Sequence, residues 1–208
     1  MKSRLSHLVL ALMAAMLCLP VCAQNYERLS VIEQELYGDY AMVNGDYQTM
    51  KAVRQYWVQQ AQRLRSIKQY EFALTGSNEG ILKVTIPARV LFAQNDSTML
   101  ASADVYLRPL LRFVKSSEPV ATLIVAGYSD NNGSERYLNM ISGSRARQVY
   151  RWFARQGVGP TEMHCYGLAN RVPRNLNATI QQREKNRRIS IYLVPNRRML
   201  RWAKKGQL

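Results

Sequence analysis

Apolar and polar positions change their spacing several times between residues 81 and 195, and each change predicts a new element. Residues 81–92 alternate apolar with polar positions and are rich in β-branched types, which predicts a strand, or a strand pair, interrupted at Pro87. Residues 102–114 instead gather apolar positions on one broad face, which predicts a helix that Pro109 either kinks or restarts. The apolar positions expected on that face are Val105, Leu107, Leu110, Leu111 and Val114.

A strand–helix–strand unit follows. Residues 120–127 read as a buried strand, residues 138–155 as a helix that Gly157 terminates, and residues 162–166 as the next strand. We expect the two strands to be parallel, because the connection is long enough for a crossover helix. A long polar loop over residues 167–185 then precedes a last strand at 188–194. This order of elements predicts an α/β domain over residues 81–195.

The flanking regions have a different character. In residues 51–72, which contain no Gly or Pro, apolar positions recur at roughly helical spacing and predict a long amphipathic helix that packs on the domain or pairs with a partner. Residues 75–80, TGSNEG, predict a linker or turn, so residues 24–80 form a helical N-terminal segment and linker. Residues 196–208 carry five basic residues and no acid, which predicts either a short basic amphipathic helix or a frayed tail.

Residues 1–23 have the layout of a secretory signal peptide. Lys2 and Arg4 precede an apolar stretch over residues 8–19, and we expect cleavage after Ala23. The apolar stretch is too short to span a bilayer comfortably, which argues against a retained anchor. Cys22 leaves lipidation open as a second option, although the valine before it fits that motif poorly.

The formal net charge of the 208-residue chain is +15. Such a surplus favours nucleic acid, an anionic membrane surface or an acidic polymer as partner. Secretion removes the protein from cellular nucleic acid, so the charge points to the cell wall, the membrane surface or solubility.

The sequence offers little other site chemistry. After cleavage at Ala23, Cys165 is the remaining cysteine, and its place in a short apolar strand favours a buried, inert thiol. His164 and Cys165 face opposite sides of a strand and make a poor metal pair. We therefore expect no metal, no cofactor and no enzymatic activity.

One acid and one base are oddly placed. Arg145 lies four residues after Ile141 and four before Val149, so it shares the apolar stripe of the predicted helix. A partly buried guanidinium needs an acid or an anionic ligand. Asp130 follows the strand 120–127 at its carboxyl end, where α/β sheets tend to bind ligands. The residues alone leave two interpretations open: a structural salt bridge, or a pair that binds the ammonium and carboxylate of a zwitterion.

Residues 82–193 carry five short motifs in order: a VLF strand at 90–92 with a polar loop after it, GYSDNNG at 127–133, ISGSRA at 141–146, GLANRVPRNLNAT at 167–179, and NRRI at 186–189. In this order the chain resembles the OmpA-like peptidoglycan-binding domain family. The resemblance implies an α+β sandwich of βαβαβ type, with a mixed sheet and helices packed on it.

The resemblance also implies a binding site. The family's loop aspartate and helix arginine fall on Asp130 and Arg145. In that family, these two residues hold the two charged groups of diaminopimelate in the peptide stem of the wall. The first arginine of the closing motif falls on Arg187. Ser129, Asn131 and Asn139 are weaker binding candidates. An asparagine usual in the family is replaced by Leu138, which puts one polar contact to the peptide in doubt.

We therefore predict non-covalent peptidoglycan binding that tethers an envelope protein or assembly to the wall. The predicted location is the periplasm of a Gram-negative bacterium, with outer-membrane association possible and an envelope protein partner on the N-terminal helix. The alternative is an envelope assembly subunit that keeps the fold for protein contacts without binding the wall.

Overall fold

The computed structural model describes residues 45–76, 79–115 and 119–208. The expected signal peptide, Cys22 and the first part of the N-terminal segment lie outside the described residues. The strands are β1 (Glu71–Thr75), β2 (Ile81–Pro87), β3 (Ala121–Tyr128), β4 (Met163–Gly167) and β5 (Arg188–Pro195). The α-helices are α3 (Tyr47–Arg63), α4 (Ala103–Leu107), α5 (Leu111–Val114), α6 (Glu135–Arg155), α7 (Ile180–Asn186) and α8 (Arg197–Lys204).

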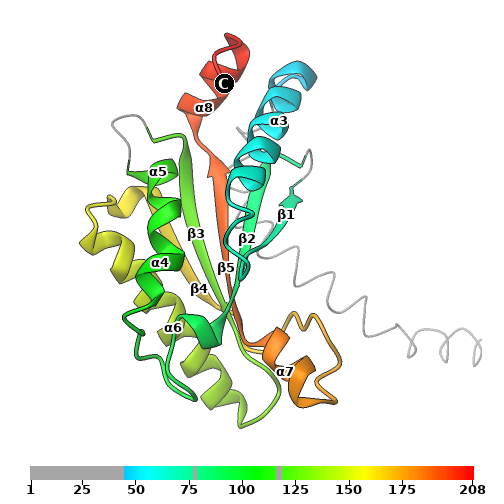
Figure 1. Cartoon of the computed structure of the whole chain (residues 1–208), viewed down its shortest axis with the longest axis vertical. Helices are drawn as coiled ribbons and strands as arrows, with labels where there is room; N and C mark the ends of the chain where they lie inside the picture. Colours follow the sequence, from blue (N-terminus) through cyan, green and yellow to red (C-terminus); the bar gives the residue numbers. More distant parts are fainter. Residues whose placement is uncertain (1–44, 77–78, 116–118) are drawn as a thin grey trace, which may run out of the picture. The chain divides into compact units, whose positions relative to one another are not determined.

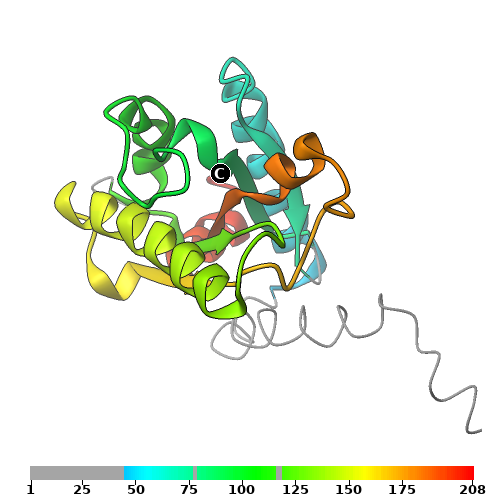
Figure 2. The ribbon, with the colours of Figure 1, turned by 90° about the horizontal axis from the view of Figure 1, so that it is seen from below.

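The strands form one mixed sheet in the order β1-β2-β5-β3-β4 (Figure 1). The crossover through α6 makes β3 and β4 parallel, as the sequence predicts, and the remaining neighbours are antiparallel. Helices α3, α4, α5 and α6 lie against the sheet (Figures 1 and 2). Their side chains share one core with every second residue of the central strands. This arrangement confirms the expected mixed sheet with helices packed on it.

Register gives the sheet two chemically distinct ends. Tyr128 pairs with Arg188 at one end of the β3–β5 ladder, and Ala121 pairs with Pro195 at the other. At about 3.3 Å per residue, the eight-residue strands separate these ends by roughly 25 Å. The loop after β3 and the α7–β5 junction lie at the first end, whereas α8 and the β1–β2 turn lie at the second.

The N-terminal helix is shorter than predicted. Asp46 caps α3 by accepting a hydrogen bond from the backbone of Thr49, and the helix ends at Arg63. Residues 71–75 instead form strand β1 and pair with β2, so the expectation that the helix reaches Phe72 is wrong. Trp57 anchors α3 because its side chain is fully buried and its Nε1–H donates to the carbonyl of Gly80 at 2.8 Å.

The region 102–114 breaks as the position of Pro109 predicts, into α4, a 3₁₀ turn over Arg108–Leu110, and α5. Val105 does not belong to its buried face, because its side chain is 65% exposed. Within the predicted loop 167–185, residues from Ile180 onward form α7, which Thr179 caps.

The basic tail is a folded helix, because Asn196 caps α8 and the side chains of Met199 and Ala203 enter the core. No helix among residues 45–76, 79–115 and 119–208 is long and apolar enough to cross a membrane.

Candidate ligand-binding site

Asp130 stands two residues beyond the end of β3 with its side chain almost fully buried. Its Oδ1 accepts a hydrogen bond from the backbone N–H of Asn132 at 3.0 Å, which turns the loop back on itself. Its Oδ2 forms an ion pair with Nη1 of Arg187. Among the described residues, each carboxylate oxygen therefore has one partner, which leaves a further lone pair on each oxygen.

Arg145 occupies the buried stripe of α6, as its spacing predicts, between Ile141 and Val149. Only 5% of the residue is exposed. Its Nε donates to the backbone carbonyl of Asp96 at 2.8 Å, and its guanidinium carbon lies 5.5 Å from the ring centre of Phe92. Burial lowers the pKa of Arg145, which means that the site carries a cation at a desolvation cost.

The two Nη groups of Arg145 have no hydrogen-bond partner among the described residues, and no described carboxylate lies within ion-pair distance of them. The fully buried side-chain atoms without a partner in that part of the chain are Ser129 Oγ, Arg188 Nε and Arg198 Nη1. Since the Nη groups of Arg145 are not among them, they keep some contact with solvent.

Arg187 is brought to Asp130 by the end of α7. The last residue of that helix, Asn186, is fully buried and accepts hydrogen bonds from the backbones of Arg174 and Asn175, at 2.8 and 3.0 Å. The carbonyl of Arg187 accepts a hydrogen bond from the backbone N–H of Ala88 at 2.9 Å. These bonds fix the backbone on both sides of the arginine, whose side chain is 33% exposed.

Asp130, Arg145 and Arg187, which we call the charged site, thus meet from three elements. Arg145 is close enough to Asp130 and Arg187 for both charges to affect its pKa. The direct pairing differs from the simplest expectation, because the ion pair of Asp130 joins it to Arg187 and not to Arg145. Two cations and one acid leave the site with a net positive charge and with unused donors on Arg145.

Comparison with known proteins shows which family the region around the charged site belongs to. A model of the OmpA family matches residues 91–187, which include all three residues of the charged site. Residues 91–187 form an OmpA family domain.

Curated relatives match this domain and part of its surroundings. The peptidoglycan-binding protein ArfA of Mycobacterium tuberculosis is 33% identical over 97 residues, which are 47% of this chain and 30% of that protein. Outer membrane protein A of Bordetella avium is 27% identical over 116 residues, or 56% of this chain and 59% of the relative. The match therefore spans less than two thirds of each relative's length.

Solved structures share the fold. A putative MotB-like protein from Desulfovibrio vulgaris superposes with a TM-score of 0.60 at 21% identity, covering 71% of this chain and 96% of the other. The cell wall anchor of the T6SS from Pseudomonas aeruginosa gives a TM-score of 0.56 at 21% identity, covering 67% and 97%. Both agree with the mixed sheet and the helices packed on it.

The weaker candidates around the OmpA family domain's charged site differ from one another. Ser129 is buried and its Oγ has no partner among the described residues, so it retains a free hydroxyl. Asn131 is exposed in the loop. Asn139 is already engaged, because its amide donates to the carbonyl of Glu135 and its Oδ1 accepts from Arg171 at 3.0 Å. Leu138 is buried in the stripe of α6 and offers no polar contact.

The sequence reasoning did not assign a role to the residues that hold Arg145. The loop 93–98 presents the carbonyl of Asp96 to Arg145 and the carbonyl of Asn95 to the hydroxyl of Tyr137, at 2.8 and 3.4 Å. Asn95 adopts a left-handed backbone conformation, with φ of 52°, to make this turn. The polar residues after the VLF motif predicted a loop, but no residue pattern predicted that a backbone carbonyl of this loop would accept a hydrogen bond from Arg145.

Proposed function

We propose that the OmpA family domain binds peptidoglycan non-covalently, through the diaminopimelate of its peptide stem, and so tethers an envelope protein or assembly to the wall. The observation that supports this most directly is Arg145, a buried guanidinium with two unpartnered Nη groups within the described residues. ArfA, which matches at 33% identity, is described as a peptidoglycan-binding protein. We assign the domain no catalytic role, and we place it on the periplasmic side of the envelope, which a signal peptide at residues 1–23 would serve.

The site suits a zwitterion on one carbon. The ligand carboxylate would accept paired hydrogen bonds from the Nη groups of Arg145, which is the geometry that guanidinium groups favour. The ligand ammonium would donate to the free lone pairs of Asp130. Arg187 balances the charge of Asp130 in the free protein and adds a second cation for the carboxylate.

A pull-down with purified sacculi tests the proposal. We expect Asp130→Ala with Arg145→Ala to weaken binding to sacculi by more than about a hundredfold, since the variant removes charge-assisted hydrogen bonds to both ligand charges. Asp104→Ala with Arg108→Ala is a matched control, because it removes an exposed ion pair between α4 and the 3₁₀ turn that follows it. If the Asp130 and Arg145 variant sediments as well as wild type, the charged site does not bind the wall.

Calorimetry separates the finer claim about the ligand. In a stem peptide, lysine in place of diaminopimelate lacks the carboxylate on the distal carbon, so we expect a stem peptide with diaminopimelate to bind measurably and the matching peptide with lysine at least about tenfold more weakly. Equal binding of the two peptides would contradict the zwitterion mechanism while leaving wall binding intact.

The ion pair between Asp130 and Arg187 favours one alternative, an assembly subunit that keeps the fold for protein contacts. In that case the pair of Asp130 and Arg187 would be a structural salt bridge, in place of the Asp130–Arg145 salt bridge that the sequence left open. Sacculi would then fail to retain the wild type, and crosslinking in cells would capture a protein partner through α3 or another surface.

A further inference from the structure

The end of the sheet away from the charged site carries a different set of charges. Helix α8 follows β5 there, and its core-facing side chains are Met199 and Ala203. Its polar side consequently points outward and exposes Arg197, Arg201 and Lys204, with Lys205 directly after the helix. None of these four cations has an acid within ion-pair distance among the described residues.

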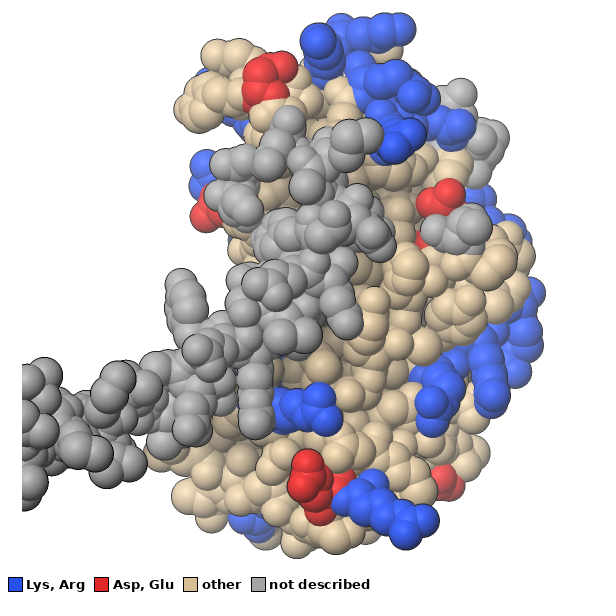
Figure 3. Space-filling view, turned by 180° about the vertical axis from the view of Figure 1, so that it is seen from behind, with Lys and Arg blue, Asp and Glu red and all other residues tan. Residues whose placement is uncertain are grey.

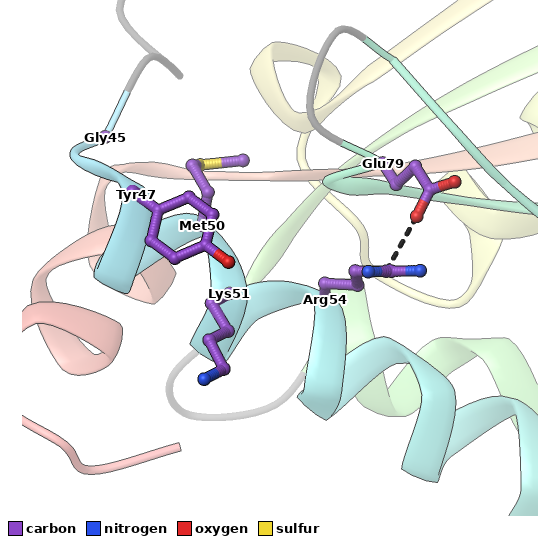
Figure 4. Close-up of a pocket in the computed structure, with 6 residues that line it drawn as sticks. All are labelled: Gly45, Tyr47, Met50, Lys51, Arg54 and Glu79. Atoms are coloured by element: carbon purple, nitrogen blue, oxygen red, sulfur yellow. Dashed lines mark ion pairs between the residues drawn. The ribbon is translucent and has the colours of Figure 1, made fainter.

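Helix α3 extends this surface, because it packs against α8. At the start of α3 there is a hollow of about 510 Å³. It is lined by Gly45, Tyr47, Met50, Lys51, Arg54 and Glu79 (Figure 4). Arg54 pairs with Glu79 at 2.7 Å, whereas Lys51 has no acidic partner among the described residues and Tyr47 is 77% exposed. We call α8, Lys205 and the first two turns of α3 the α8 end.

Figure 3 shows one group of Lys and Arg side chains at the top of the molecule, where α8 lies in Figure 1, and further groups along the lower right edge of this face. A typical protein interface has an apolar core from which charged residues are depleted. The α8 end has the opposite composition, with several exposed cations and the exposed ring of Tyr47. Cations with an amphipathic aromatic side chain suit the headgroup layer of a bilayer, where phosphates meet the edge of the acyl chains.

We propose that the α8 end docks on an anionic phospholipid surface. The basic side chains contact headgroup phosphates, Lys51 reaches a phosphate that enters the hollow, and Tyr47 lies at the headgroup level. Because register places the charged site at the other end of β3 and β5, that site faces away from the docked membrane. The inference does not depend on wall binding, since no residue of the charged site takes part in it.

Co-sedimentation of the full chain with lipid vesicles tests this inference. We expect binding to phosphatidylcholine vesicles that contain phosphatidylglycerol, weak binding to phosphatidylcholine alone, and loss of binding at high salt. An apolar leader would insert into both kinds of vesicle, so the difference between them reports the headgroup contacts. Arg201→Glu with Lys204→Glu and Lys205→Glu should weaken binding to anionic vesicles by about tenfold or more.

A matched variant controls for net charge. Arg136→Glu with Arg147→Glu and Lys185→Glu changes the charge equally at exposed positions on α6 and α7, and we expect it to retain most of the binding. Circular dichroism of both variants checks that they fold. If wild type ignores the anionic vesicles, or if the two triple variants lose binding equally, the α8 end is not a lipid-docking surface. A wild type that binds neither kind of vesicle would leave an acidic protein as the candidate partner.

Discussion

The two ends of this sheet use positive charge in opposite ways. At the charged site, Arg145 is 5% exposed and is held by a backbone carbonyl and an aromatic ring. At the α8 end, Arg197, Arg201 and Lys204 are exposed and have no acid in ion-pair distance within the described residues. A buried cation costs desolvation energy unless an opposite charge pairs with it. It therefore favours a ligand that brings one anionic group to that position. Exposed cations cost little singly, and they act together through their summed field on a large anionic partner.

The largest expected effect concerns the close packing of β3 against α6, the helix that carries Arg145. An ideal Cβ at Gly127 would lie 2.2 Å from the backbone carbonyl oxygen of Ser142 in α6, and neither backbone can yield without moving β3 or the helix that carries Arg145. We expect Gly127→Ala to lower the free energy of unfolding by about 3 kcal/mol or more, measured by chemical denaturation.

Gly143→Ala on α6 is the matched control, because a Cβ at Gly143 would lie 3.8 Å from the nearest heavy atom outside the helix backbone. It should leave stability unchanged or raise it by up to about 1 kcal/mol, as expected for an alanine that replaces a helical glycine. If both substitutions have equal effects, the close approach of β3 and α6 does not constrain the site.

The next largest effect distinguishes the two arginines of the charged site. We expect Arg145→Ala to weaken sacculus binding about a hundredfold, or about 2.7 kcal/mol, because its Nη donors have no other partner among the described residues. Arg187→Ala should cost about tenfold, since its more exposed guanidinium mainly balances Asp130. Binding isotherms on purified sacculi give both values, and a larger loss for Arg187 would reverse the proposed roles.

Measuring both sacculus binding and vesicle binding for a variant at each end compares the two ends directly. The triple substitution of Arg201, Lys204 and Lys205 should leave sacculus binding within about twofold of wild type, because roughly 25 Å separates the ends. Arg145→Ala should likewise leave binding to anionic vesicles unchanged. A variant at one end that weakens both interactions equally would show that net charge alone governs them.

Features of the fold and of the charged site that depend on spacing along the chain could be predicted from the sequence, whereas features that depend on contacts between distant residues could not. The position of Arg145 on a helical stripe and of Asp130 after a strand follow from spacing, and the structure places both as expected. The partner of Asp130 does not follow, because Arg187 reaches it through the end of α7 and the long-range bonds of Asn186. Phe72 matched a helical period by chance, while its pairing with Val84 in the sheet decided its true state. The fold of α8 was equally undetermined, since burial of Met199 depends on residues far away in the chain.

The last predicted effect concerns Lys83, which lies in β2 away from the charged site. Burial, together with the charges of Arg188 and Arg174, lowers its pKa to about 8 from 10.5. The unfolded chain therefore holds its proton more tightly than the folded one, so this group destabilises the fold fully below about pH 8. That cost is relieved as the pH rises from about 8 to about 10.5, where the folded state has released the proton.

We expect Lys83→Met to raise the free energy of unfolding by about 1–2 kcal/mol at pH 7, and the gain to shrink toward zero by about pH 10.5. Denaturant titrations across this range measure it, with Lys68→Met, an exposed lysine, as the control. A gain that does not vary with pH would mean that methionine packs better there, and that the charge of Lys83 costs the sheet nothing.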